Sequence, residues 1–130
     1  MIQGIHHISL RCGSDDDYAR AREFYCGVLG LRVFREWDGG MMVGSGAGRI
    51  EIFRSGGGTR QVGAVRHFAF ACGDADAAVS AVRAAGYEVF VEPRDIVLPS
   101  DPPVRARVAF CRGPLGEEIE FFDEKQEECP

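Results

Sequence analysis

Two stretches of the sequence follow one pattern, His7-Ile8-Ser9-Leu10-Arg11-Cys12 and His67-Phe68-Ala69-Phe70-Ala71-Cys72. Each begins with His, alternates apolar residues with others, and ends with Cys. Such alternation is typical of a β-strand with one buried face. A pattern that occurs twice in one chain also indicates two similar halves.

The landmarks that follow each stretch occur in the same order. An acidic cluster leads into a helix that Ser14 or Asp74 caps, and a glycine, Gly30 or Gly86, ends it. Each half then closes on a strand with a central glutamate, in Arg49-Ile50-Glu51-Ile52-Phe53 and Glu118-Ile119-Glu120-Phe121-Phe122. We therefore predict a strand, a helix and further strands in each half. The glycine-rich residues 55–59 are predicted to be the hinge, and residues 95–103 a loop over the second half.

Strand alternation predicts where the polar residues of these strands point. His7 and His67 lie on the face opposite the apolar residues that should pack on the helices, and so do Glu51 and Glu120. A single His or Glu on a strand is usually a solvated or hydrogen-bonded residue. Four of them at repeat-equivalent positions favour a shared divalent metal ion, because imidazole nitrogen and carboxylate oxygen suit such ions.

Two neighbouring residues could compete for this role. His6 lies on the other side of the strand from His7 by alternation, so we interpret it as structural. Glu118 shares a face with Glu120. The match between the two glutamate-centred strands selects Glu120.

Composition excludes several classes of function. The net charge is −5 and the 15 basic residues are scattered, so nucleic acid is not an expected partner. Five cysteines without a C-x-x-C pair argue against a disulfide scaffold and a thiolate zinc site. We find neither a signal peptide nor an apolar run of the ~20 residues that cross a bilayer. We therefore expect a cytoplasmic protein with no membrane contact.

At these residues the chain resembles the vicinal oxygen chelate superfamily, which includes glyoxalase I, extradiol dioxygenases and bleomycin-binding proteins. The motifs that carry the resemblance span about residues 4–124 and are His7-Ile8-Ser9-Leu10, Arg22-Glu23-Phe24-Tyr25, Val28-Leu29-Gly30-Leu31, Arg66-His67-Phe68-Ala69-Phe70 and Gly113-Pro114-Leu115-Gly116. The resemblance implies an α+β fold of two βαβββ modules, about residues 3–55 and 62–124 of a single domain 1–130. In that family the sheets form a cup around a divalent metal ion.

The resemblance also implies a site. Its metal ligands would be His7, Glu51, His67 and Glu120, and the ion would be Ni, Co, Zn, Mn or Fe. Two His and two Glu look most like glyoxalase I (lactoylglutathione lyase), whose substrate is a hemithioacetal of glutathione and methylglyoxal and whose reaction passes through a metal-bound enediolate. Glu120 would be the catalytic base.

Further roles follow from the same likeness. Arg11 stands where glyoxalase I contacts the glutathione carboxylate, and Arg107 is expected nearby, so we expect an anionic or carbonyl substrate, with glutathione or another thiol as cosubstrate. The relatives suggest a homodimer. The alternatives are a non-catalytic binding or resistance protein and an epimerase that acts on another acyl substrate.

Overall fold

The structure is a computed structural model of the 130-residue chain, and it describes residues 1, 5–57, 67–100 and 102–125. The chain divides into two compact units, Met1–Arg60 and Gln61–Pro130, which we call the first and second modules and describe separately. The predicted hinge at residues 55–59 extends into residues 58 and 59, which lie outside the described part.

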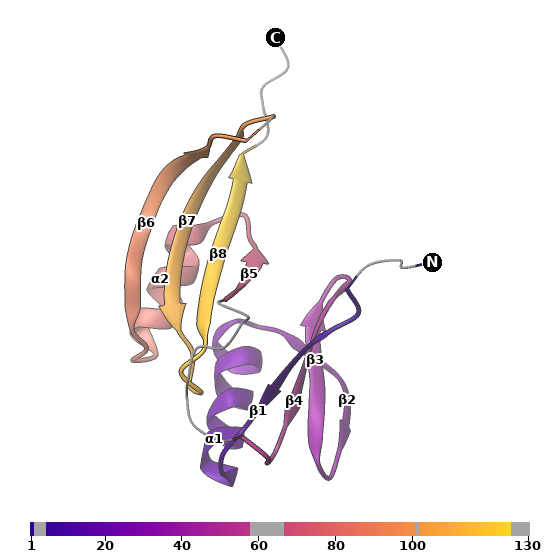
Figure 1. Cartoon of the computed structure of the whole chain (residues 1–130). Helices are drawn as coiled ribbons and strands as arrows, with labels where there is room; N and C mark the ends of the chain where they lie inside the picture. Colours follow the sequence, from indigo (N-terminus) through magenta and orange to yellow (C-terminus); the bar gives the residue numbers. More distant parts are fainter. Residues whose placement is uncertain (2–4, 58–66, 101, 126–130) are drawn as a thin grey trace. The chain divides into compact units, whose positions relative to one another are not determined.

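The first module contains one four-stranded sheet and one helical segment (Figure 1). Its elements are β1 (Ile8–Arg11), α1 (Asp15–Arg22), the π-helix η1 (Glu23–Val28), β2 (Arg32–Trp37), β3 (Gly40–Ser45) and β4 (Gly48–Phe53). The strand order is β1-β4-β3-β2. The pair β1–β4 is parallel and the other pairs are antiparallel.

The second module repeats this arrangement. Its elements are β5 (Phe68–Ala71), α2 (Ala75–Ala84), β6 (Val89–Leu98), β7 (Val104–Arg112) and β8 (Glu118–Lys125). The order β5-β8-β7-β6, with β5–β8 parallel, matches the first sheet strand for strand. The predicted α+β fold of two βαβββ modules is therefore confirmed. No helix in the described part of the chain is both long and apolar enough to span a membrane.

The helix boundaries follow from local chemistry. The Ser14 hydroxyl accepts a hydrogen bond from the Asp17 backbone N–H at 3.1 Å, and the Asp74 carboxylate accepts one from Ala77 at 2.9 Å. Both are N-caps, as predicted, because they satisfy amide groups that have no partner inside the helix. Gly30 and Gly86 follow the helical segments with φ angles of 74° and 89°, the left-handed conformation that glycine adopts without strain.

In each module the helix side of the sheet forms the core. In the first sheet Met41 pairs with Ile52 and Val43 with Ile50, and all four side chains are buried. In the second sheet the equivalent buried residues are Ala109, Cys111, Ile119 and Phe121, and Val79 and Val82 of α2 are buried too. Because successive strand residues point to opposite faces, Glu51 and Glu120 lie on the other face of each sheet.

The prediction that residues 95–103 form a loop is wrong for residues 95–98. They form the end of β6, paired with β7 from Asp95↔Arg107 to Leu98↔Val104, and do not belong to a loop. Ile96, Val97 and Leu98 are apolar residues that extend readily, so the prolines at 99, 102 and 103 restrict only the turn. Pro93 is tolerated within β6 because this strand lies at the sheet edge and its pairing is irregular there.

A substitution at Gly44 tests how closely the strands of the first sheet pack. A Cβ atom at this position would lie 2.1 Å from the Gly48 carbonyl oxygen, so Gly44→Ala must displace backbone. We expect Gly44→Ala to lower the free energy of unfolding by about 1–3 kcal/mol in urea denaturation. Gly73→Ala is the control, because a Cβ there meets nothing within 4 Å. Equal stability of the two variants would contradict this account of β3.

Candidate metal centre

Strand register places a His and a Glu together in each module. Glu51 of β4 lies opposite Ser9 of β1, and Glu120 of β8 lies opposite Ala69 of β5. His7 and His67 come two residues before these small partners, so each imidazole reaches the neighbouring glutamate. The distance from Nε2 to Oε1 is 3.5 Å for His7 and Glu51 and 3.4 Å for His67 and Glu120.

These distances suit two ligands of one metal ion. Ligand atoms about 2.1 Å from a divalent ion, at angles between about 90° and 109°, lie roughly 3.0–3.4 Å apart. The His67–Glu120 distance lies at the upper limit of this range and the His7–Glu51 distance 0.1 Å beyond it, and both pairs offer the nitrogen and oxygen donors that such ions bind. Each His–Glu pair therefore fits as one half of a metal site.

The structure groups the four predicted ligands as two pairs. His7 and Glu51 belong to the first module, and His67 and Glu120 to the second. Among the described residues, no group of three or more His, Cys, Asp or Glu side chains has the spacing to hold a metal ion. A four-ligand site thus needs both pairs to act together.

Burial and contacts keep the two pairs in place. The Glu51 and Glu120 side chains are only 14% and 12% exposed, whereas both His side chains are about one-third exposed. The Phe110 ring lies edge-on to the His67 ring at 5.3 Å between centroids, because Phe110 pairs with Glu120 across the sheet. No sequence pattern indicates this contact, because it depends on the register between β7 and β8.

Glu118 is held away from a ligand role by an ion pair. Its Oε1 lies 3.2 Å from Nη1 of Arg112, the residue opposite it on β7. The selection of Glu120 over Glu118 agrees with this pairing.

His6 lies closer to the site than alternation predicted. Its Nδ1 is 2.9 Å from Nδ1 of His7, and the two rings meet edge to face. The prediction placed His6 on the far side of a strand, but β1 begins only at Ile8, so alternation does not govern residues 6 and 7. In the tautomer in which the His7 Nδ1–H donates this hydrogen bond, the His7 Nε2 is unprotonated and can bind a metal ion.

The two arginines predicted to bind substrate lie in different places. Arg11 is exposed and shares the face of Glu51, because its neighbour Ser9 is two residues away and pairs with Glu51. Arg107 pairs across the sheet with the buried Asp123, which puts it on the helix side, opposite Glu120. The expectation that Arg107 lies near the metal ligands is therefore wrong.

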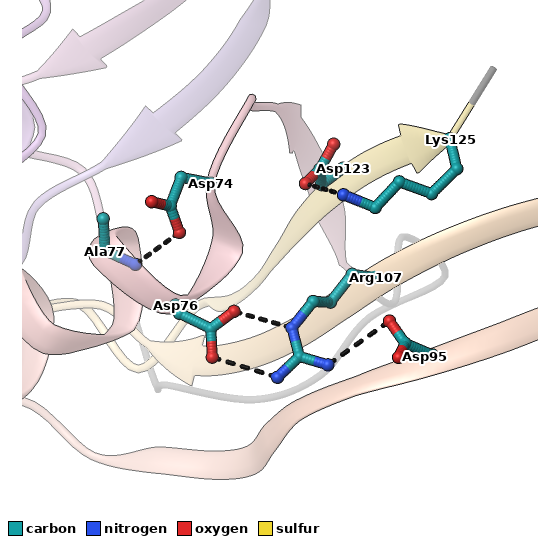
Figure 2. A network of polar contacts seen from close by, with 7 residues as sticks. All are labelled: Asp74, Asp76, Ala77, Asp95, Arg107, Asp123 and Lys125. Atoms are coloured by element: carbon teal, nitrogen blue, oxygen red, sulfur yellow. Dashed lines mark hydrogen bonds and ion pairs between the residues drawn. The ribbon is translucent and has the colours of Figure 1, made fainter.

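Arg107 instead ties α2 and β6 to β7 (Figure 2). Its Nε and Nη2 donate to the two Asp76 carboxylate oxygens at 2.6 and 3.0 Å, and Nη1 donates to Asp95 at 3.3 Å. The two-pronged hydrogen bond from Arg107 lowers the pKa of Asp76, and the two carboxylates raise the pKa of Arg107. Nearby, Lys125 donates to Asp123 at 2.6 Å. This network fastens α2 and β6 to β7 within the second module.

Comparison with known proteins agrees with the two-module fold. The sequence profile described as "Glyoxalase/Bleomycin resistance protein/Dioxygenase superfamily" matches residues 4–121. The chain belongs to this superfamily. A search of curated proteins gave no match.

Solved structures of this superfamily's fold extend over nearly the whole chain. A putative glyoxalase family protein from Bacillus anthracis is 25% identical, with a TM-score of 0.70 over 96% of this chain and 98% of that one. A glyoxalase family protein from Enterococcus faecalis is 21% identical, with a TM-score of 0.71 over 93% and 98%. TnmS3, an antibiotic binding protein from a Streptomyces species, is 16% identical, with a TM-score of 0.67 over 96% and 100%. These likenesses show the shared fold and leave the activity open.

The Arg107 network predicts a pH dependence of stability. Because the pKa of Asp76 is lowered below its ordinary 3.8, its stabilising contribution is present above that pH and is lost as the pH falls through the folded-state pKa. We expect Asp76→Asn to lower the melting temperature at pH 6, and the difference from the wild type to shrink as the pH falls below 3.8, measured by circular dichroism at low salt. Asp38→Asn, in the exposed turn after β2, is the control. A deficit in Asp76→Asn that persists unchanged at acid pH would contradict this role.

Proposed function

We propose that this protein is a metal-dependent lyase or isomerase of the glyoxalase I type. The observation that carries the proposal is the pair of equivalent His–Glu contacts, at 3.5 and 3.4 Å, on equivalent strands of the two modules. His7, Glu51, His67 and Glu120 would together hold one divalent ion, within one chain or across two copies. The closeness to glyoxalase I rests on this two-His, two-Glu set.

The bound ion would supply Lewis-acid polarisation of the substrate's oxygen atoms. Glu120 then removes a proton from the carbon next to the carbonyl and returns it to the neighbouring carbon. Its carboxylate suits this exchange because Ala69 and Phe110 flank it, and His67 is the polar side chain in contact with it among the described residues. Glu51 holds the equivalent position in the first module and serves as a ligand.

The proposed substrate is a hemithioacetal or a related carbonyl compound with an anionic end. Arg11 carries the positive charge for that end, since its exposed guanidinium lies on the face of Glu51. Glutathione or another thiol would be the cosubstrate.

A non-catalytic binding protein is the second candidate. The fold is shared with TnmS3, which binds an antibiotic, and the Glu51 face carries aromatic rings of the kind that bind small molecules. Metal content and turnover separate the two candidates.

Metal binding is the first prediction of the proposed function. We expect purified protein to bind nickel, cobalt or zinc, with one ion for each set of the four ligands. Calorimetry and elemental analysis measure this ratio. Glu51→Gln and His67→Ala should each weaken binding at least tenfold, since each removes one donor. Glu118→Gln is the control, on the same strand and face as Glu120 but paired with Arg112. A protein that binds none of these ions would favour the non-catalytic candidate.

Turnover is the second prediction. The metal-loaded protein is expected to convert the methylglyoxal–glutathione hemithioacetal, followed by ultraviolet absorbance. Glu120→Gln should reduce kcat about 10²–10⁴-fold, the usual contribution of a general base. Metal content of this variant is measured in parallel, so that a lost ligand is not mistaken for a lost base. Near-normal kcat in Glu120→Gln would remove the residue from this role, and no turnover by the wild type would refute the glyoxalase assignment.

A homodimer is proposed as the working form. Each sheet ends on two edge strands, β1 and β2 or β5 and β6, whose backbone groups a second copy could pair or cover. We expect light scattering at micromolar concentration to give twice the mass of one chain. The mass of a single chain would contradict the proposal.

A further inference from the structure

The Glu51 face of the first sheet carries aromatic rings and guanidinium groups together. Cross-strand pairing extends from Glu51 through Met42 to Arg35, and from Phe53 through Gly40 to Trp37. Residues paired in this way point to one face of a sheet. Arg49 and Arg32 lie on the same face, because both pair with Gly44. We call this surface the aromatic–arginine face, made of Arg32, Phe34, Arg35, Trp37, Arg49 and Phe53.

Two rings on this face lie against each other, and one of them lies against the backbone. The Trp37 and Phe53 rings meet edge to face with centroids 6.1 Å apart. The Trp37 ring lies close over Gly40, where an added Cβ would be 3.1 Å from its Cζ2 atom. A glycine beneath an indole lets the ring lie flat on the backbone.

The guanidinium groups are stacked on these rings. The Arg35 guanidinium lies 4.8 Å from the Trp37 ring centroid, and those of Arg49 and Arg32 lie 3.5 and 4.4 Å from that of Phe34. Arg49 also donates to the carbonyl oxygens of Gly46 and Gly48 at 2.7 and 3.3 Å. Such stacking is favourable and orders the guanidinium before any ligand binds.

These arginines differ in their charge partners from three arginines of the second module. Within the part of the chain that the structure describes, Arg32, Arg35 and Arg49 form no ion pair with a carboxylate. Arg83, Arg107 and Arg112 all form one or more. Glu51, the acidic residue in the paired rows of this face, is held by His7. A chain of net charge −5 thus presents a cationic face beside one half of its metal site.

We propose that the aromatic–arginine face binds a small planar aromatic ligand that carries an anionic group. The ring stacks on the Trp37–Arg35 pair, and the anion is held by the guanidinium donors that no carboxylate occupies. This proposal rests on the proposed function and extends its substrate class to anionic carbonyl compounds that carry an aromatic ring, because Met42 pairs with Glu51 and Arg35 and so connects the face to the His7–Glu51 pair.

The chain offers a direct reporter for the test. Trp37 is its only tryptophan, so one indole N–H signal in a nitrogen-15 NMR spectrum reports on this face. The probe is 2-naphthoate, titrated in the presence of a chelator so that no metal is needed. Two comparison compounds separate the contributions: 2-naphthalenemethanol has the ring without the charge, and cyclohexanecarboxylate has the charge without the aromatic ring.

We expect 2-naphthoate to shift the indole signal and to saturate, with each comparison compound binding at least about tenfold more weakly. Arg35→Gln should weaken 2-naphthoate binding about tenfold, and Trp37→Leu, followed by calorimetry, at least as much. Arg105→Gln is the charge-matched control, because Arg105 is exposed and lies on the helix side of the second sheet, two residues from Arg107. It should leave the dissociation constant within about twofold.

Three outcomes would overturn the proposal. They are the absence of any indole shift, equal binding of all three compounds, and equal weakening by Arg105→Gln and Arg35→Gln. The result is independent of the metal chemistry, because the titration uses metal-free protein. If the protein binds 2-naphthoate but no metal ion, the proposed lyase activity is refuted and the aromatic–arginine face remains a binding site. If it binds metal but not 2-naphthoate, the binding site is refuted and the lyase proposal remains.

Discussion

The parallel pairing of the first and last strands is the constraint on which each module depends. It places a small residue, Ser9 or Ala69, directly opposite the glutamate of the last strand. The imidazole of the histidine two residues earlier can then extend across that small residue and contact the carboxylate. A shift of this register by one residue would turn the glutamate toward the buried helix side, where an unpaired carboxylate is costly. The packing of the core and the geometry of the candidate ligands are therefore set by one alignment.

Arginines have different surroundings at two places in the fold. On the helix side of the second sheet, the ion pair of Arg107 with Asp76 fastens α2 to the sheet. On the Glu51 face of the first sheet, the Arg35 guanidinium lies beside the Trp37 ring. Arginine thus stabilises the fold where a carboxylate binds its guanidinium, and is available for a ligand where its guanidinium lies on an aromatic ring. The difference lies in whether a carboxylate occupies the guanidinium.

Much of this structure could be predicted from the sequence because the same pattern of strand, helix and glutamate-centred strand occurs twice in the chain. The repeat located the strands, the caps Ser14 and Asp74, and all four candidate ligands. Two residues depart from the prediction for physical reasons. Only the β7–β8 register shows which face Arg107 takes, and strand alternation does not extend to His6 because β1 begins at Ile8. The aromatic–arginine face was missed because cross-strand partners such as Trp37 and Phe53 are not neighbours in the sequence.

Trp37 also determines what optical measurements of unfolding report. The one indole belongs to β2, and the second module has no tryptophan. Its fluorescence therefore follows the first module, whereas far-ultraviolet circular dichroism follows the backbone of both. Coincident transitions by the two methods would mean that the modules melt as one cooperative unit, and separate transitions that each half of the duplicated chain folds on its own.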